Sequence, residues 1–161
     1  MKFCEFIQPQ AVVASLQSPD RDGVIREMVA VLVAAGSIPA GAAEAIIQSL
    51  LSRERNGTTG IGRGVATPHC KCVDVPTLVG AVGISSRGVD FNALDEKPVY
   101  VVFMLLSPQG QDARHLQAME VVFRNLNKDV FRKALRMSET REEVVDLLAD
   151  ADAGQGVPAS E

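Results

Sequence analysis

The sequence predicts an α/β (α+β) fold in which a mixed β-sheet is sandwiched by helices. Two apolar runs in the middle of the chain have the length and composition of strands. Apolar residues at helical spacing precede and follow these runs. The chain has 161 residues, of which 47% are hydrophobic and 22% are charged, as in a folded globular protein. We therefore expect one domain over residues 1–150 and a frayed, disordered tail at 151–161, where little can be buried.

Two helices are expected in the first third of the chain. The first begins after the turn-like Ser18-Pro19-Asp20 and ends before Gly36, since glycine is common at helix C-termini. The second begins near Pro39 and ends near Arg55, because the helix-breaking pair Asn56-Gly57 follows. Both carry apolar residues three and four positions apart, so each has one face to bury.

The segment from Gly57 to Lys71 has neither a helical nor a strand period. Glycines alternate in it with small and polar residues, and Pro68 directly precedes His69. Glycine lets another backbone or a phosphate approach closely, and proline stiffens the chain beside the imidazole. We expect a loop, with room for one short strand, that presents an accessible histidine.

The two apolar runs are expected to form the centre of the sheet. Leu78 to Ile84 and Val99 to Leu106 have strand character, and the second run is apolar enough to be buried on both faces. Pro98 opens the second run, where a strand tolerates proline. Turn signals surround Val89 and Phe91 between the two runs, and a short edge strand is expected there.

Three helices are expected in the C-terminal third. A long helix carries Leu116, Met119 and Leu126 at positions predicted to face the core. A shorter helix follows it. The last helix begins at Thr140, which has capping-box spacing to Glu143.

Composition excludes several classes of partner. The net charge of −4 and the aromatic content of 4% argue against a nucleic-acid-binding protein. The longest apolar run, Val99 to Leu106, is far shorter than the roughly 20 residues of a membrane helix, so no membrane insertion is expected. No signal sequence is visible at the N-terminus, and three cysteines do not make a disulfide framework. We therefore expect a cytoplasmic protein with free thiols.

Three residues have side chains suited to phosphate chemistry. His69 closes the glycine-rich segment. His115 falls in the first turn of the long third helix, just after Asp112, where free backbone amides favour an anion and disfavour an imidazolium. Arg53 ends the second helix, and its forked guanidinium suits phosphate oxygens. Each of the three could also be a solvated or capping side chain with no functional role. The surrounding motifs therefore decide between a structural and a functional role.

Four motifs surround these residues. They are Leu50-Leu51-Ser52-Arg53-Glu54-Arg55, Thr59-Gly60-Ile61-Gly62, Gly64-Val65-Ala66-Thr67-Pro68-His69, and the block from Pro98 to Pro108 followed by His115-Leu116. Together they resemble the active-site signature of enzyme IIA of the fructose and mannitol type, from the phosphoenolpyruvate-dependent sugar phosphotransferase system. The resemblance spans roughly residues 6–148, and the second motif looks most like the nitrogen-regulatory branch.

The resemblance implies a phosphotransferase/anion-transport-protein-like fold and a phosphoryl carrier. By this resemblance, His69 matches the histidine that accepts a phosphoryl group from an HPr-like histidine phosphocarrier protein. His115 and Arg53 match the supporting histidine and arginine. Thr67 stands where the family usually has an aliphatic residue, and Cys70 stands where glycine or alanine is commoner. These departures bear on loop packing and partner preference more than on the chemistry.

Transfer between two histidines sets the chemical requirements. One nitrogen of a neutral His69 must attack phosphorus while the other holds a proton, and the sequence does not say which. Because similar bonds break and form, the main demands are in-line positioning and screening of the phosphoryl oxygens. We therefore expect neither a metal nor a cofactor.

Several functions stay open at this stage. A nitrogen-regulatory-type regulator is favoured, because one IIA-like domain is present without a IIB-like domain or a membrane segment. The alternatives are a sugar-uptake IIA component that donates phosphate to a separate IIB domain, and a binding module that is never phosphorylated. A zinc site would need ligands beyond Cys70 and Cys72, and a hydrolase would need a nucleophile and a carboxylate arranged around His69.

Overall fold

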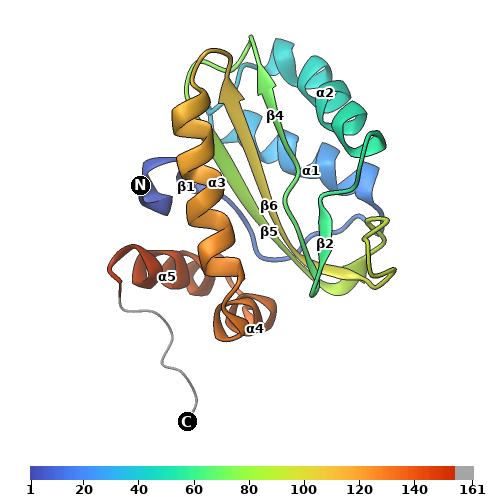
Figure 1. Ribbon diagram of the computed structural model, residues 1–161, viewed down its shortest axis with the longest axis vertical. Helices are drawn as coiled ribbons and strands as arrows, with labels where there is room; N and C mark the ends of the chain where they lie inside the picture. The colour runs from blue at the N-terminus through green and yellow to red at the C-terminus, as the bar shows by residue number, and fades with distance from the viewer. Residues whose placement is uncertain (155–161) are drawn as a thin grey trace.

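Six strands form one mixed sheet with helices on both faces, as predicted (Figure 1). The computed structural model describes residues 1–154, so positions 155–161 of the predicted tail lie outside the described residues. The strands are β1 (Ile7–Val13), β2 (Gly60–Gly62), β3 (Val65–Ala66), β4 (His69–Cys72), β5 (Val79–Val89) and β6 (Val99–Pro108). The helices are α1 (Arg21–Ala34), α2 (Ala43–Arg55), α3 (Asp112–Leu126), α4 (Asp129–Met137) and α5 (Arg141–Asp152), with short 3-10 turns η1 (Phe3–Glu5) and η2 (Ala40–Ala42).

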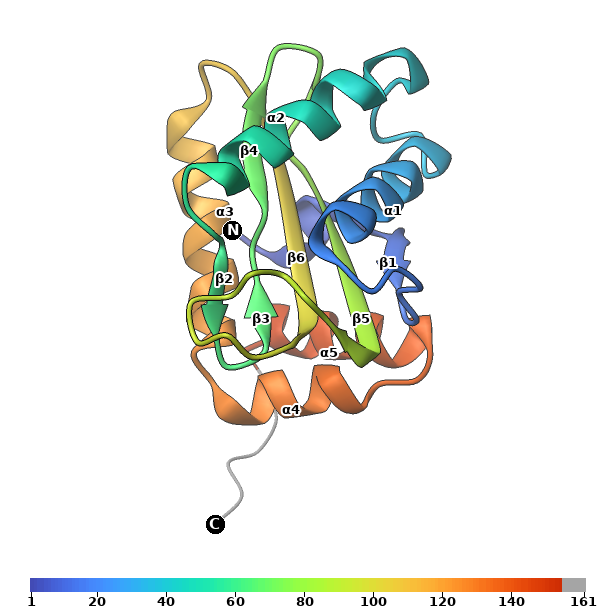
Figure 2. The same ribbon diagram turned by 90° about the vertical axis from the view of Figure 1, so that its right-hand side faces the viewer.

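The two predicted apolar runs form β5 and β6, which are antiparallel neighbours at the centre of the sheet. β1 runs parallel to β5. β3 and β4 run parallel to β6 and follow one another along its other edge (Figure 2). β6 is therefore the strand that connects the glycine-rich segment to the rest of the sheet.

Each face of the sheet has its own hydrophobic core. α1 and α2 cover one face and bury Ile25, Leu50 and Phe91 against it. α3, α4, α5 and η1 cover the other face and bury Phe3 and Leu135 (Figure 1). Because side chains alternate along a strand, β6 contributes to both cores, which explains why its sequence is continuously apolar.

The prediction for the glycine-rich segment was wrong in one respect. Residues 57–71 were expected to form a loop with at most one short strand, but they carry β2, β3 and β4. β2 and β3 form a tight hairpin in which Arg63 and Gly64 have φ of +58° and +76°. β3 and β4 are specified by backbone pairing with β6, and β2 by its hairpin turn and pairing with β3, so these strands leave no regular apolar alternation in the sequence.

Other element boundaries also differ from the predictions. No separate edge strand forms near Val89, because β5 itself continues to that residue after an irregular register beyond Ile84. β1 was not predicted at all, since three consecutive exposed residues interrupt its apolar pattern. α5 ends at Asp152, two residues beyond the predicted end of the domain.

One predicted core residue of α3 lies on the surface. Leu116 is 67% exposed, whereas Ala118 and Val122 lie against the sheet. The buried face of α3 also includes His115. The helix is therefore rotated relative to the predicted apolar face, so that the imidazole rather than Leu116 points inward.

Candidate functional site

β4 carries His69, the first candidate residue, and successive residues of this strand point to opposite faces of the sheet. His69 pairs with Leu105 of β6 at the start of the strand. Its ring lies 5.6 Å from the ring of His115, between centroids, at an interplanar angle of 49°. Lys71, two residues on, forms an ion pair of 2.8 Å with Asp112 at the start of α3. β4 therefore presents His69 and Lys71 toward α3, as the alternation of a strand requires.

The His69 ring is held by a backbone carbonyl. Its Nδ1 atom lies 2.8 Å from the Thr67 carbonyl oxygen. A carbonyl can only accept a hydrogen bond, so Nδ1 carries a proton, and in the neutral form of the ring the lone pair is then on Nε2. Backbone hydrogen bonds from Thr67 to Thr59 and from Leu105 to Pro68 fix the peptide that carries this carbonyl. The half-buried imidazole is thus oriented by Nδ1, and Nε2 is the ring nitrogen that this contact leaves unused.

His115 is the second imidazole of the site and is buried, with 7% of its surface exposed. Its Nδ1 atom lies 2.5 Å from Oγ of Ser107, a buried residue near the end of β6. Burial lowers the pKa of His115, the neighbouring His69 and Lys71 lower it further, and Asp112 opposes them weakly. A serine hydroxyl can donate or accept. In the neutral tautomer in which Nδ1 accepts from it, the proton is on Nε2, and that atom is a hydrogen-bond donor.

Arg53 lies in the last turn of α2 and is exposed. Its guanidinium donates to the Gly57 carbonyl oxygen at 2.9 Å. Within residues 1–154 no hydrogen bond joins Arg53 to either histidine. The structure therefore brings His69 and His115 together, while Arg53 stabilises the turn that leads from α2 into β2.

Sequence reasoning missed several residues that shape the site. Ser107 and Lys71 were not singled out, although each carries a polar group at an informative position: a hydroxyl near the end of an apolar strand, and a cation two residues from His69. Glu54 was also missed. Its buried carboxylate accepts from the Thr59 amide at 3.0 Å and from the Thr59 hydroxyl, which anchors the start of the glycine-rich segment.

The two cysteines of β4 point away from the histidines. Cys72 belongs to the core beneath α1 and α2, and Cys70 packs against that core. Their Sγ atoms lie 2.8 Å apart, and this thiol hydrogen bond raises the pKa of Cys70 and lowers that of Cys72. Both thiols are free. In the described part of the chain, no three His, Cys, Asp or Glu side chains are arranged to hold one metal ion.

Comparison with known proteins identifies the family. Residues 5–151 match the family described as "Phosphoenolpyruvate-dependent sugar phosphotransferase system, EIIA 2". This chain belongs to that family. Among curated relatives, the nitrogen regulatory protein of Bradyrhizobium diazoefficiens is 32% identical over 149 residues, which cover 92% of this chain and 95% of that protein.

A second curated relative and a solved structure are also similar to this chain. The fructose-specific EIIABC component of Bacillus subtilis is 33% identical over 152 residues, or 94% of this chain, but this chain spans only 24% of that protein's length. The crystal structure of nitrogen regulatory protein IIA-Ntr from Neisseria meningitidis superimposes with a TM-score of 0.80 at 27% identity, covering 89% of this chain and 97% of that one.

Among the helices of residues 1–154, none has both the length and the apolar character needed to cross a bilayer.

Proposed function

We propose that this EIIA 2 chain is a phosphoryl carrier and that Nε2 of His69 accepts the phosphoryl group. The observation that carries the proposal is the hydrogen bond from His69 Nδ1 to the Thr67 carbonyl, which leaves Nε2 unused in a ring whose centroid lies 5.6 Å from that of His115. The donor is an HPr-like histidine phosphocarrier protein. Its protonated phosphohistidine loses the phosphorus–nitrogen bond as the bond to Nε2 forms, and its imidazole leaves neutral.

His115 is proposed as the supporting donor at this site. With Ser107 on its Nδ1, the Nε2–H of a neutral His115 is available to the phosphoryl oxygens. The lowered pKa of His115 favours its neutral form. In that form the ring can donate a hydrogen bond to the phosphoryl group while the proton of His69 stays on His69.

Arg53 is proposed as a clamp on the same oxygens. A guanidinium has five N–H donors, and the hydrogen bond to the Gly57 carbonyl uses only part of them. The remaining donors are the ones we propose for the phosphoryl oxygens.

We favour a regulatory role of the nitrogen-regulatory type. The likeness to nitrogen regulatory proteins over nearly the full length of both chains supports it. Phosphorylation adds about two negative charges to a surface at neutral pH, which is enough to admit one partner protein and repel another. In this role His69 carries the signal to a regulatory target protein.

Sugar uptake is the second candidate function, supported by the likeness to a fructose-specific EIIABC component. In that role a separate IIB domain would take the phosphoryl group from His69. Incubating the phosphorylated chain with candidate IIB domains and following label transfer separates the two roles. Rapid transfer to a IIB domain supports uptake, and retention of the label on His69 supports regulation.

The carrier function itself is tested by incubating the chain with phosphoenolpyruvate, enzyme I and the phosphocarrier. We expect an acid-labile adduct on His69 that is lost in His69→Ala and formed more slowly in His115→Ala. A folded wild-type chain that gains no adduct would instead indicate a binding module that is never phosphorylated. Circular dichroism of both variants provides the control for folding.

A further inference from the structure

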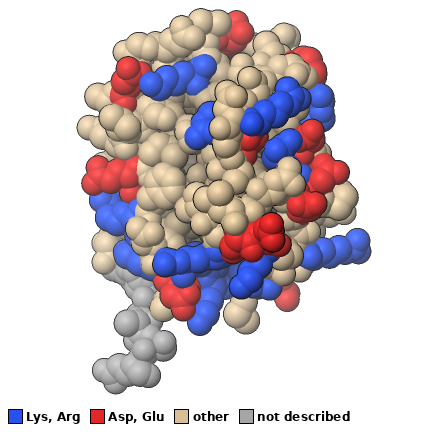
Figure 3. All heavy atoms as spheres, turned by 45° about the vertical axis from the view of Figure 1, so that its right-hand side comes forward, with Lys and Arg blue, Asp and Glu red and all other residues tan. Residues whose placement is uncertain are grey.

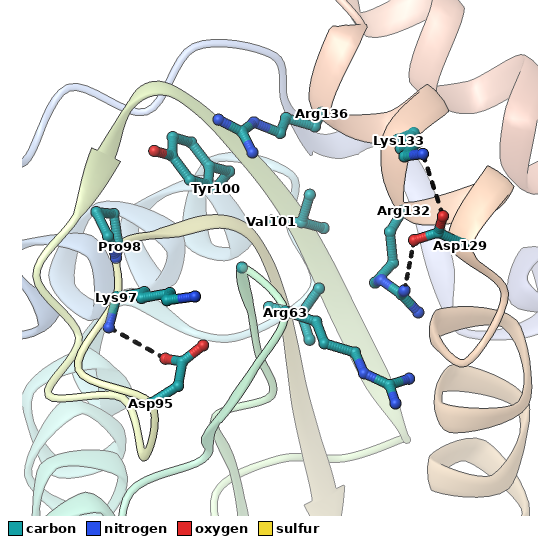
Figure 4. A pocket seen from close by; sticks show the side chains of 12 residues that line it. Arg63, Asp95, Lys97, Pro98, Tyr100, Val101, Asp129, Arg132, Lys133 and Arg136 are labelled. Carbon is teal, nitrogen blue, oxygen red and sulfur yellow. Dashed lines mark hydrogen bonds and ion pairs between the residues drawn. The ribbon is translucent and has the colours of Figure 1, made fainter.

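A cavity of about 590 Å³ lies between α4 and the start of β6 (Figure 4). Its floor includes Val65 and Val101, which pair with each other. His69 pairs with Leu105, four residues farther along β6, so about 13 Å of strand separate the two places. The cavity is therefore distinct from the proposed phosphorylation site.

Five cationic side chains line this cavity. Arg63 comes from the turn between β2 and β3, Lys97 from the loop before β6, and the rest from α4. The three from α4 are Arg132, Lys133 and Arg136. Figure 3 shows Lys and Arg side chains gathered toward the end of the molecule that carries α4. Because the whole chain has a net charge of −4, this positive charge is a local concentration.

Two carboxylates, Asp95 and Asp129, also line the cavity, and they neutralise only part of this charge. Asp129 forms ion pairs of 2.8 Å with Arg132 and 3.1 Å with Lys133. Within residues 1–154, Arg63, Lys97 and Arg136 have no carboxylate within 4.0 Å of their charged groups. The side chains surround the cavity from opposite sides, with Lys97 on one wall and α4 on the other (Figure 4).

Arg136 is held in place by an aromatic ring. Its guanidinium carbon lies 3.5 Å from the centroid of the Tyr100 ring. The ring itself packs closely against Gly64 and Gly88, where an added Cβ would come within 3.3 Å and 3.2 Å of it. A stacked guanidinium keeps its in-plane N–H groups free, so Arg136 is oriented without using the donors that bind an anion.

Arg63 occupies a backbone position that disfavours arginine. Arg63 and Gly64 are the two central residues of the hairpin, and both have positive φ, as a type I′ turn requires. Asn, Asp or Gly normally fills the first of these positions, and a long side chain there adds strain. Strain retained at a cavity wall is an observation that points to function.

We propose that this cavity binds a small anion that carries two or more phosphate groups, with Arg63, Lys97 and Arg136 as its main ligands. Forked guanidinium groups match phosphate oxygens, and three cations without carboxylate partners favour a multiply charged ligand over a single carboxylate. The volume lies in the range of small-molecule sites. The proposal does not depend on phosphorylation of His69.

Inorganic pyrophosphate is the probe that tests this site. We expect calorimetric titration of the full chain, at an ionic strength of about 0.15 M, to show saturable binding of one pyrophosphate per chain, tighter than that of inorganic phosphate. Amide resonances of Arg63, Lys97 and Arg136 should shift, while that of His69 should not. A chain that cannot be phosphorylated should bind pyrophosphate equally well, which keeps this test separate from that of the carrier function.

Arg63→Asn is the decisive variant, because it removes the cation and places a favoured residue in the turn. Affinity for pyrophosphate should fall about tenfold or more, while the melting temperature should rise. Arg26→Gln, on α1 at the opposite face of the sheet, makes the same change in net charge and should leave the affinity unaltered.

Three results would overturn the proposal. Pyrophosphate that does not saturate the chain is one. Equal weakening by Arg63→Asn and Arg26→Gln is the second, since it would indicate general charge attraction only. Tighter binding of a single-stranded oligonucleotide than of pyrophosphate to the same residues is the third, since it would assign the cations to a nucleic acid surface.

Discussion

At the scale of single residues, the two histidines are controlled through their Nδ1 atoms. The Thr67 carbonyl fixes the proton of His69, and the Ser107 hydroxyl contacts His115. Neither contact is visible in the sequence, because one involves a backbone oxygen and the other joins a strand to a helix. That the two imidazoles share one site was predicted from the motifs, whereas the atom that each ring uses to hold its position comes from the structure.

The pH dependence of stability follows from His115. Burial lowers its pKa below the ordinary value of 6.5. The unfolded chain therefore binds a proton here at a higher pH than the folded chain does. The stability due to a neutral His115 is fully present above about pH 6.5 and is lost as the pH falls through the lowered folded-state pKa.

Urea unfolding between about pH 7.5 and about pH 5.5 measures this effect. The free energy of unfolding of the unphosphorylated wild-type chain should fall over this window, and His115→Gln should show a shallower fall. Parallel curves for the two proteins would contradict the assignment.

At the scale of elements, long periodic segments were predictable and short paired ones were not. α1 and β6 lie where their apolar spacing placed them, because burial of one or both faces is recorded directly in the sequence. β3 and β4 depend on backbone pairing with the distant β6, and β2 is held by its hairpin with β3, so local apolar pattern does not specify these strands. The same reason explains why the Arg63 cavity, built from three segments, was not predicted.

The junction between α2 and β2 depends on one carboxylate. Glu54→Ala would leave the amide of Thr59 without its acceptor in a buried place. We expect a loss of about 1–3 kcal/mol in the free energy of unfolding, measured by urea denaturation. Glu44→Ala, at an exposed position of the same helix, is the control and should cost much less, because its ion pair with Arg26 lies in solvent. Equal losses in the two variants would show that the Glu54 contact contributes nothing specific.

At the scale of the whole molecule, β6 joins the two cores. Phe103 and Met104 are adjacent in sequence, yet Phe103 packs beneath α3 to α5 and Met104 beneath α1 and α2. A strand that is shared in this way couples the two helical layers, so neither layer can separate without exposing β6. We therefore expect the chain to unfold as one cooperative unit.

Phe103→Ala and Met104→Ala test this coupling. Each should lower the free energy of unfolding by about 2–5 kcal/mol, because each leaves a cavity in a buried position. Circular dichroism and Tyr100 fluorescence should report coincident transitions in both variants. Val73→Ala, at a position that is 75% exposed, should change little. Two separate transitions in either variant would show that the layers unfold independently.

The alternation along β4 also limits how this part of the sequence can change. Deleting or inserting a single residue between Ala66 and His69 would shift β4 by one position against β6 and exchange its two sides. A thiol would then face α3, and the imidazole would enter the packing beneath α2. Insertions or deletions here are therefore expected to be tolerated only when they change the length by an even number of residues, or when a β-bulge restores the original facing of the side chains.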